Sequence, residues 1–112
     1  MPSYQNNQNY ITELRRGSLT LMILGCMRKP HYGYALLQTL QNLGVDIEAN
    51  TLYPLLRRLE SQGLLKSDWD TGGSRPRKYY SINERGEAVL RDLLSAWQNM
   101  QESLDAIFME EA

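Results

Sequence analysis

The chain has 112 residues, a formal net charge of −1, one cysteine (Cys26) and one histidine (His31). That length allows one small domain with a modest core and excludes a large enzyme cleft with separate cofactor and substrate lobes. A lone cysteine excludes an internal disulfide framework, and with a lone histidine it cannot build a zinc site within one chain, so we expect no metal and no cofactor.

The N-terminal segment 1–9 is polar and rich in asparagine and glutamine, and we expect it to be frayed. It has neither the basic part nor the apolar part of a secretion signal, and no apolar run in the chain approaches the length of a membrane span. These features indicate a cytoplasmic protein that does not enter a membrane.

The first predicted helix covers residues 10–28 and carries apolar residues on two sides. Such a helix suits a position between its own domain and either the C-terminal helix or a second subunit, and Cys26 is expected to pack within it. Pro30 ends this helix, and His31 is placed to begin a second one, which Gly44 closes. Because a lone histidine at a helix start is more often structural than catalytic, we assign His31 no catalytic role.

The third predicted helix, within residues 50–64, is amphipathic. Its inward side is formed by Leu52, Leu55, Leu56 and Leu59, and its outward side by Asn50, Pro54, Arg57 and Ser61, with Tyr53 and Arg58 at the margins. Asn50 or Thr51 is expected to cap the helix, with Pro54 within or just past its first turn, and Gly63 to end it. The outward side suits an anionic partner, although a solvated arginine pair explains this stretch equally well.

Residues 65–70 and 77–82 have the composition of β-strands, and the segment 71–76 between them contains a Gly-Gly pair that indicates a hairpin turn. Three helices followed by such a hairpin predict a winged helix, in which the last of these helices enters the DNA major groove and the hairpin contacts the neighbouring backbone. The hairpin residues suited to phosphate contact are Ser74, Arg75, Arg77 and Lys78.

Charge is distributed unevenly along the chain. Residues 50–80 hold six basic and three acidic side chains, whereas residues 81–112 hold two basic and seven acidic ones. Because exposed charges are screened over roughly 8–10 Å at physiological salt, a local basic patch can bind phosphates while a remote acidic helix repels them weakly. We expect the acidic C-terminal end to lie far from DNA.

The last predicted helix follows Asn83, which is placed to cap it. Apolar residues recur along it at alternating spacings of three and four, the pattern of a coiled-coil seam about three heptads long: Leu90, Leu93, Trp97, Met100, Leu104 and Ile107. Since so small a domain cannot bury this seam, we expect these residues to form a homodimer interface. The alternative is one long helix lying across its own domain.

The predicted fold is therefore mainly α with a small β-hairpin, a winged helix-turn-helix followed by a C-terminal dimerisation helix. The DNA-binding domain is expected over residues 1–82 and the dimerisation helix over residues 83–112. A second possible function is a winged-helix module whose arginine face binds an acidic protein. Enzyme activity is the least supported function, because the sequence offers no paired nucleophile and base and no glycine-rich phosphate loop.

Four stretches together resemble the PadR family of bacterial transcriptional regulators. They are HYGYALL from His31, NTLYPLLRRLESQGLL from Asn50, SRPRKYYSINERG from Ser74, and the terminal helix; with the N-terminal helix they cover nearly the whole chain. The combination of TLYPLLRRLE with RPRKYY is specific, and the single C-terminal helix is similar to the small members of the family. The resemblance implies a homodimer that binds a palindromic operator in double-stranded DNA, usually as a repressor relieved by a small molecule.

The resemblance also assigns residues. The recognition-helix positions fall on Thr51, Tyr53, Pro54, Arg57 and Arg58, and the wing positions on Ser74, Arg75, Arg77 and Lys78. Asn50 and Ser74 depart from the family, which usually has glycine at both places. Asparagine tolerates similar backbone angles, so Asn50 is kept among the DNA-binding residues, whereas Ser74 leaves the wing conformation open.

Trp97 is similar in place to a tryptophan of the lactococcal multidrug-binding member of this family, in which paired tryptophans hold flat drugs at the dimer interface. A tryptophan in a tight seam is hard to accommodate without space nearby, which is consistent with a cavity. Trp97, Met100 and Leu93 are therefore candidate contacts for a small hydrophobic or aromatic effector. The alternative is a packed interface residue.

Overall fold

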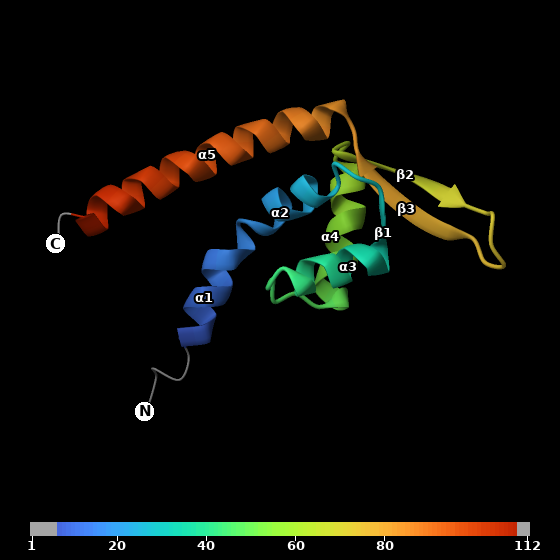
Figure 1. Cartoon of the computed structure of the whole chain (residues 1–112), viewed down its shortest axis with the longest axis horizontal. Coiled ribbons are helices and arrows are strands. Elements are labelled where there is room, and N and C mark those ends of the chain that lie inside the picture. The colour runs from blue at the N-terminus through green and yellow to red at the C-terminus, as the bar shows by residue number, and fades with distance from the viewer. Residues whose placement is uncertain (1–6, 110–112) are drawn as a thin grey trace.

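The computed structural model describes residues 7–109 and shows a winged helix from which one long helix projects (Figure 1). In chain order the elements are α1 (Asn7–Arg16), α2 (Leu19–Cys26), β1 (His31–Tyr32), α3 (Gly33–Asn42), α4 (Ala49–Ser61), β2 (Leu65–Asp70), β3 (Arg77–Ile82) and α5 (Glu84–Met109). The strands form one antiparallel sheet in the order β1-β3-β2. The fold class predicted from the sequence is confirmed.

The prediction of one helix over residues 10–28 is wrong, because a turn at Gly17 and Ser18 separates α1 from α2. The hydroxyl and the backbone N–H of Ser18 both donate to the carbonyl of Arg15, at 2.8 and 2.9 Å, and Gly17 disfavours a continuous helix. Residues 7–9, which were expected to be frayed, begin α1. The rest of segment 1–9 lies outside the described residues.

His31 does not begin a helix, and that prediction is also wrong. It lies on the two-residue strand β1, opposite Tyr80 of β3, and α3 begins two residues later at Gly33. The Nδ1 atom of His31 is 2.8 Å from the carbonyl oxygen of Lys29. A strand of two residues is too short to show an alternating pattern, so only its pairing with β3 reveals it.

Glycine ends α3 and α4, as predicted. Gly44 and Gly63 adopt φ angles of +89° and +79°, where a side chain would be strained. After α4, the N–H of Gly63 donates to the carbonyl of Glu60 and the N–H of Leu64 to that of Leu59, both at 3.0 Å. These two bonds form a Schellman motif, which turns the chain from α4 into β2.

The start of α4 differs from the prediction. The helix begins at Ala49 with Glu48 before it, so neither Asn50 nor Thr51 is the cap, whereas Pro54 lies just past the first turn, as predicted. The carbonyl of Glu48 accepts the N–H groups of Thr51 and the next residue, both at 3.0 Å. Asn50 and Thr51 are therefore in the first turn, with exposed side chains.

The core lies between α2, α3, α4 and the sheet. Three of the four leucines expected on the inward side of α4 are fully buried, and Leu55 is half-buried. Cys26 packs at the end of α2 beside this core, as predicted, and burial raises the pKa of its thiol. The buried residues from the other elements include Ile23, Leu24, Met27, Leu36, Leu40, Tyr80 and Ile82.

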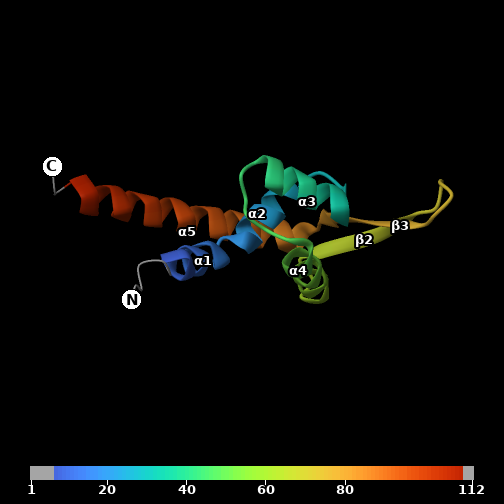
Figure 2. The same ribbon diagram turned by 90° about the horizontal axis from the view of Figure 1, so that it is seen from below.

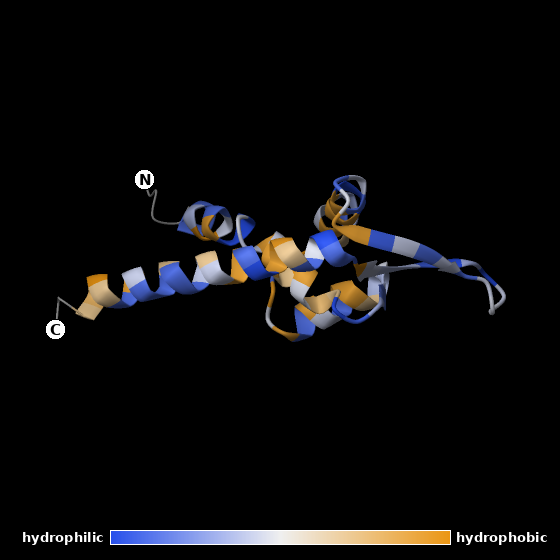
Figure 3. Ribbon diagram, turned by 90° about the horizontal axis from the view of Figure 1, so that it is seen from above, coloured by the Kyte–Doolittle hydropathy of each residue, from blue (hydrophilic) through white to orange (hydrophobic). Residues whose placement is uncertain are grey.

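Within the described residues, α5 packs against the core through the first part of its length, at Val89, Leu90 and Leu93. Farther along, Trp97 and Leu104 are 43% and 51% exposed. Figures 1 and 3 show α5 extending away from the winged helix, with hydrophobic residues recurring along its length. The alternative of a helix lying across its own domain is therefore wrong. Within residues 7–109, no helix is long and apolar enough to cross a membrane.

Candidate nucleic-acid interface

The outer face of α4 carries most of the residues predicted to contact DNA. Asn50, Thr51, Pro54, Arg57 and Arg58 are all exposed. Neither of the two guanidinium groups forms an ion pair with a carboxylate among residues 7–109. Their charge and hydrogen-bond donors are thus available to a ligand in the isolated subunit.

Tyr53 is half-buried because its ring packs against the start of α3. A Cβ atom added to Gly33 would lie 3.2 Å from Cε1 of Tyr53, so glycine at this position allows α3 and α4 to approach closely. Tyr53 consequently joins the polar face of α4 to the first residues of α3.

The hairpin projects between α4 on one side and the start of α3 on the other (Figure 2). Ser74 and Arg75 are exposed in its turn, as predicted. The turn begins where the N–H of Gly72 donates to Oδ1 of Asp70 at 3.0 Å. Arg77 and Lys78 follow on β3, and because successive side chains of a strand point to opposite faces, they face opposite sides of the hairpin.

Lys78 lies on the side facing α4 and is held by that helix. Its Nζ atom is 3.1 Å from Oε1 of Glu60, and the hydroxyl of Ser67 donates to the other oxygen of the same carboxylate. The bonds from Ser67 and Lys78 lower the pKa of Glu60. Partial burial lowers the pKa of Lys78, but the interactions with Glu60 and Tyr80 together outweigh it, so the net shift is upward. Lys78 is half-buried, unlike the other wing cations.

Arg77 lies on the opposite side and contacts two tyrosines that the sequence did not single out. Its guanidinium carbon is 4.6 Å from the ring centroid of Tyr32, and its Nη1 atom donates to the hydroxyl oxygen of Tyr34 at 3.1 Å. The hydroxyl of Tyr32 in turn donates to Oδ2 of Asp70. This bond raises the pKa of Tyr32 and lowers that of Asp70.

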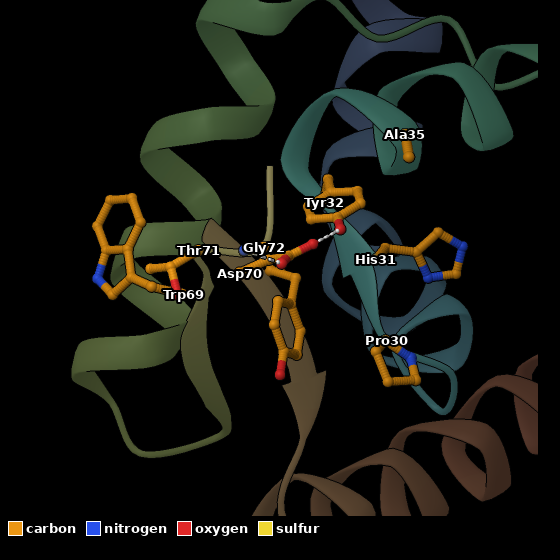
Figure 4. Close-up of a pocket in the computed structure, with 9 residues that line it drawn as sticks. Pro30, His31, Tyr32, Ala35, Trp69, Asp70, Thr71 and Gly72 are labelled. Atoms are coloured by element: carbon orange, nitrogen blue, oxygen red, sulfur yellow. Dashed lines mark hydrogen bonds between the residues drawn. The ribbon is translucent and has the colours of Figure 1, made fainter. Parts of the chain in front are cut away.

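Figure 4 shows the bond between Tyr32 and Asp70 across a surface hollow of about 620 Å³. His31, Trp69 and Gly72 also line this hollow, which lies between β1 on one side and the end of β2 with the hairpin turn on the other. The tyrosines were missed because their role depends on pairing between β1 and β3. The only sequence signal is the repeated aromatic residue in HYGY, which begins at His31.

The arrangement offers hydrogen-bond donors and positive charge rather than catalytic groups. Among residues 7–109, no three His, Cys, Asp or Glu side chains come together as metal ligands.

The predicted effector contacts Leu93, Trp97 and Met100 lie on α5, far along the chain from the basic residues of α4 and the hairpin. A hollow of about 560 Å³ between α2, α3 and the start of α5 is lined mainly by apolar side chains, including Leu90 and Leu94.

Comparisons with known proteins give the family. Residues 21–92 match the transcriptional regulator PadR-like family. The transcriptional regulator Rv3488 of Mycobacterium tuberculosis is 35% identical over 81 residues, covering 71% of this chain and 76% of that protein. A PadR family transcriptional regulator from Eggerthella lenta has a crystal structure that aligns with a TM-score of 0.87 and 48% identity, covering 95% of this chain and 96% of the other. The structure of a PadR-like transcription factor from Bacteroides fragilis aligns with a TM-score of 0.74 and 33% identity. This alignment covers 88% of this chain and 98% of the other.

Proteins of this family are winged-helix transcriptional regulators that bind DNA, and they are not enzymes. DNA is therefore favoured over an acidic protein as the partner of the arginine-bearing face. The match over residues 21–92, together with the likeness to the solved regulators over nearly the whole chain, shows that this chain belongs to the PadR-like family of transcriptional regulators.

Proposed function

We propose that the protein binds palindromic operator DNA as a homodimer and represses transcription. In each subunit α4 enters the major groove, and the hairpin turn lies on the flanking backbone. The observation that carries this proposal is the exposed outer face of α4, where Arg57 and Arg58 have no carboxylate partner among residues 7–109. Arg75 extends the basic surface to the hairpin turn, where phosphates of the same duplex lie within reach.

The exposed seam of α5 supports the homodimer. Burying apolar surface is worth about 25 cal/mol per Å², so a helix with half-exposed Trp97, Leu104 and Ile107 gains stability from a second copy. Two subunits joined through residues 83–112 hold their domains, residues 1–82, at one separation. Successive major grooves on one side of the duplex lie roughly 34 Å apart, and that separation decides whether both α4 helices fit.

A small hydrophobic or aromatic effector is proposed to bind between the two α5 helices and release DNA. Trp97, with Leu93 and Met100, supplies the apolar contacts. A ligand that prefers one packing of the helices changes the separation of the two DNA-binding domains, and DNA affinity changes by linkage. The Trp69→Phe variant tests whether an effector binds beside Trp97, because Trp97 is then the remaining tryptophan. Binding of the planar dye rhodamine 6G is expected to quench its fluorescence.

The main experiment measures DNA binding by fluorescence anisotropy, with a duplex selected from a random-sequence pool by the wild-type protein. Arg57→Ala is expected to raise the dissociation constant at least about fivefold, because one good contact to a base is worth about 1–3 kcal/mol. Arg91→Ala is the matched control, since Arg91 is exposed on α5. If Arg57→Ala has the same dissociation constant for the duplex as the wild type and the Arg91→Ala control, the outer face of α4 is not the DNA-binding surface.

A further inference from the structure

The contact between Arg77 and Tyr34 fixes a cation at the end of β3 that adjoins the hairpin turn. The rings of Tyr32 and Tyr34 are stacked, with centroids 5.7 Å apart and planes 3° from parallel. The guanidinium of Arg77 lies against the Tyr32 ring and donates one hydrogen bond to the Tyr34 oxygen. An arginine held on two sides in this way loses less conformational freedom when it binds a ligand than an arginine on a free loop.

The direction of that hydrogen bond determines what Tyr34 can do. Because Arg77 donates, the Tyr34 oxygen is the acceptor, and the hydroxyl hydrogen of Tyr34 remains available. The guanidinium has five N–H donors, of which one is used by Tyr34. Tyr34 is 49% exposed and Arg77 is also exposed, so the remaining donors of both side chains are accessible to a ligand.

One carboxylate lies near this pair and limits its charge. Asp70 is directly opposite Arg77 on the hairpin, but its oxygens already accept the Tyr32 hydroxyl and the Gly72 N–H. Asp70 therefore holds Tyr32 beneath the guanidinium and leaves the outer donors of Arg77 unoccupied. The chemistry that remains, one cation beside a neutral hydroxyl donor, suits a singly charged phosphodiester.

The pair lies on the side of the hairpin opposite Lys78 and adjoins both surfaces assigned to DNA. Gly33, the neighbour of Tyr34, packs against Tyr53 on the polar face of α4, and Arg77 belongs to the wing. In Figure 2 the start of α3 and α4 lie on the two sides of the hairpin root. A phosphate bound here would lie near both the polar face of α4 and the hairpin turn.

We propose that Tyr34 and Arg77 together bind one phosphate of the DNA backbone, and that Tyr34 is thus a further DNA-binding residue. The inference rests on the proposed function. Tyr34→Phe removes one hydroxyl and keeps the ring, and it is expected to raise the dissociation constant for the selected duplex about three- to tenfold. The dependence of affinity on salt stays unchanged in this variant, because no charge is lost. Arg77→Ala lowers the magnitude of that dependence by about one.

The control is Tyr10→Phe, which removes the hydroxyl of a tyrosine on α1. A second measurement replaces the duplex phosphates one at a time by neutral methylphosphonate. At one phosphate in each half-site, the wild type is expected to lose affinity, whereas Tyr34→Phe loses markedly less from the same replacement. Circular dichroism and the melting temperature of each variant establish that it is folded.

The inference is overturned if Tyr34→Phe binds within twofold of wild type while Arg57→Ala is weakened, or if no methylphosphonate position couples to Tyr34. If selection from the random-sequence pool enriches no duplex that the wild type binds, or if Arg57→Ala binds the selected duplex as tightly as the wild type does, the proposed function itself fails. The two failures are thus distinguishable.

Discussion

At the scale of single residues, Glu60 connects the recognition helix to the wing. It is the one acidic residue of α4, and its carboxylate accepts both the Ser67 hydroxyl and the Lys78 ammonium. Two strands of the hairpin are thereby attached to the end of α4, so the helix and the wing are placed as one body. The same carboxylate offsets one positive charge beside the proposed DNA surface.

Replacing Glu60 by glutamine separates these two roles. Glu60→Gln keeps the shape of the side chain and removes its charge, so Lys78 is released from its ion pair and becomes available to phosphate. The magnitude of the salt dependence of DNA binding is expected to rise by about one. Anisotropy titrations from 50 to roughly 200 mM salt measure it, with Glu87→Gln on α5 as the control. An unchanged slope would show that Lys78 does not reach the backbone.

The same residue makes stability depend on pH. Because the folded pKa of Glu60 lies below its ordinary value of 4.5, its contribution is complete above pH 4.5 and is lost as the pH falls through the folded pKa. The free energy of unfolding of the wild type is therefore expected to fall more steeply on acidification than that of Glu60→Gln. Urea denaturation of both proteins from pH 7 to pH 3 measures the difference. Parallel curves would contradict a lowered pKa.

At the scale of elements, the first turn of α5 is fixed by contact with the end of α4. Asn83 caps the helix, as predicted, with its Oδ1 atom accepting the N–H of Gly86 at 2.8 Å, and its Nδ2 atom donates to the carbonyl of Gly63. Gly86 is buried against the backbone of Leu64. The direction in which α5 leaves the domain is therefore set by backbone contacts.

Gly86→Ala tests this junction. An added Cβ would lie 2.1 Å from the carbonyl oxygen of Leu64, which belongs to the backbone and cannot rotate away. The variant is expected to lose about 1–3 kcal/mol of stability, although alanine favours helix over glycine by about 0.5–1 kcal/mol. Urea denaturation measures the loss. Gly25→Ala in α2 is the control, because its added methyl group meets nothing within 4 Å in the subunit, and it is expected to be neutral or stabilising.

Elements whose signals are local could be predicted from the sequence, and those that depend on distant partners could not. The strands β2 and β3 were predicted with their observed bounds, because strand-forming residues and a Gly-Gly turn identify a hairpin within 18 residues. The strand β1 was missed because it exists only through pairing with β3. The exposure of Asn50, Pro54 and Arg57 on the outer face of α4 followed from helical periodicity. The contact of Tyr34 could not be predicted in this way, since its partner Arg77 lies 43 residues away.

At the scale of the whole molecule, charge and apolar surface are separated along the long axis. The subunit measures 58 × 37 × 23 Å, with the wing near one end and α5 near the other. The basic side chains of α4 and the hairpin are thus far from the distal half of α5, where Glu102 and Asp105 lie. With a Debye length of roughly 8 Å at physiological salt, those carboxylates repel DNA weakly. The proposed DNA surface and the proposed dimer interface therefore lie toward opposite ends of the molecule, and a negative net charge is compatible with DNA binding.

The proposed dimer depends on the distal half of α5, and one substitution in the seam tests it. Leu104→Glu removes an apolar side chain and introduces a charge that two subunits would place close together. Since burying one leucine is worth about 1.5–3 kcal/mol and two copies contribute, the dimer dissociation constant is expected to rise at least about 100-fold.

Sedimentation equilibrium at micromolar concentration measures that constant, and DNA titrations on the selected duplex are expected to show weaker binding in parallel. Gln98→Glu is the matched control, because it adds the same charge to an exposed position on the other side of α5 and is expected to leave the dimer intact. A wild-type chain that sediments as a monomer, or a Leu104→Glu variant that dimerises as tightly as Gln98→Glu, would show that the seam is not the subunit interface. The spacing of the two α4 helices would then have to be set by another surface.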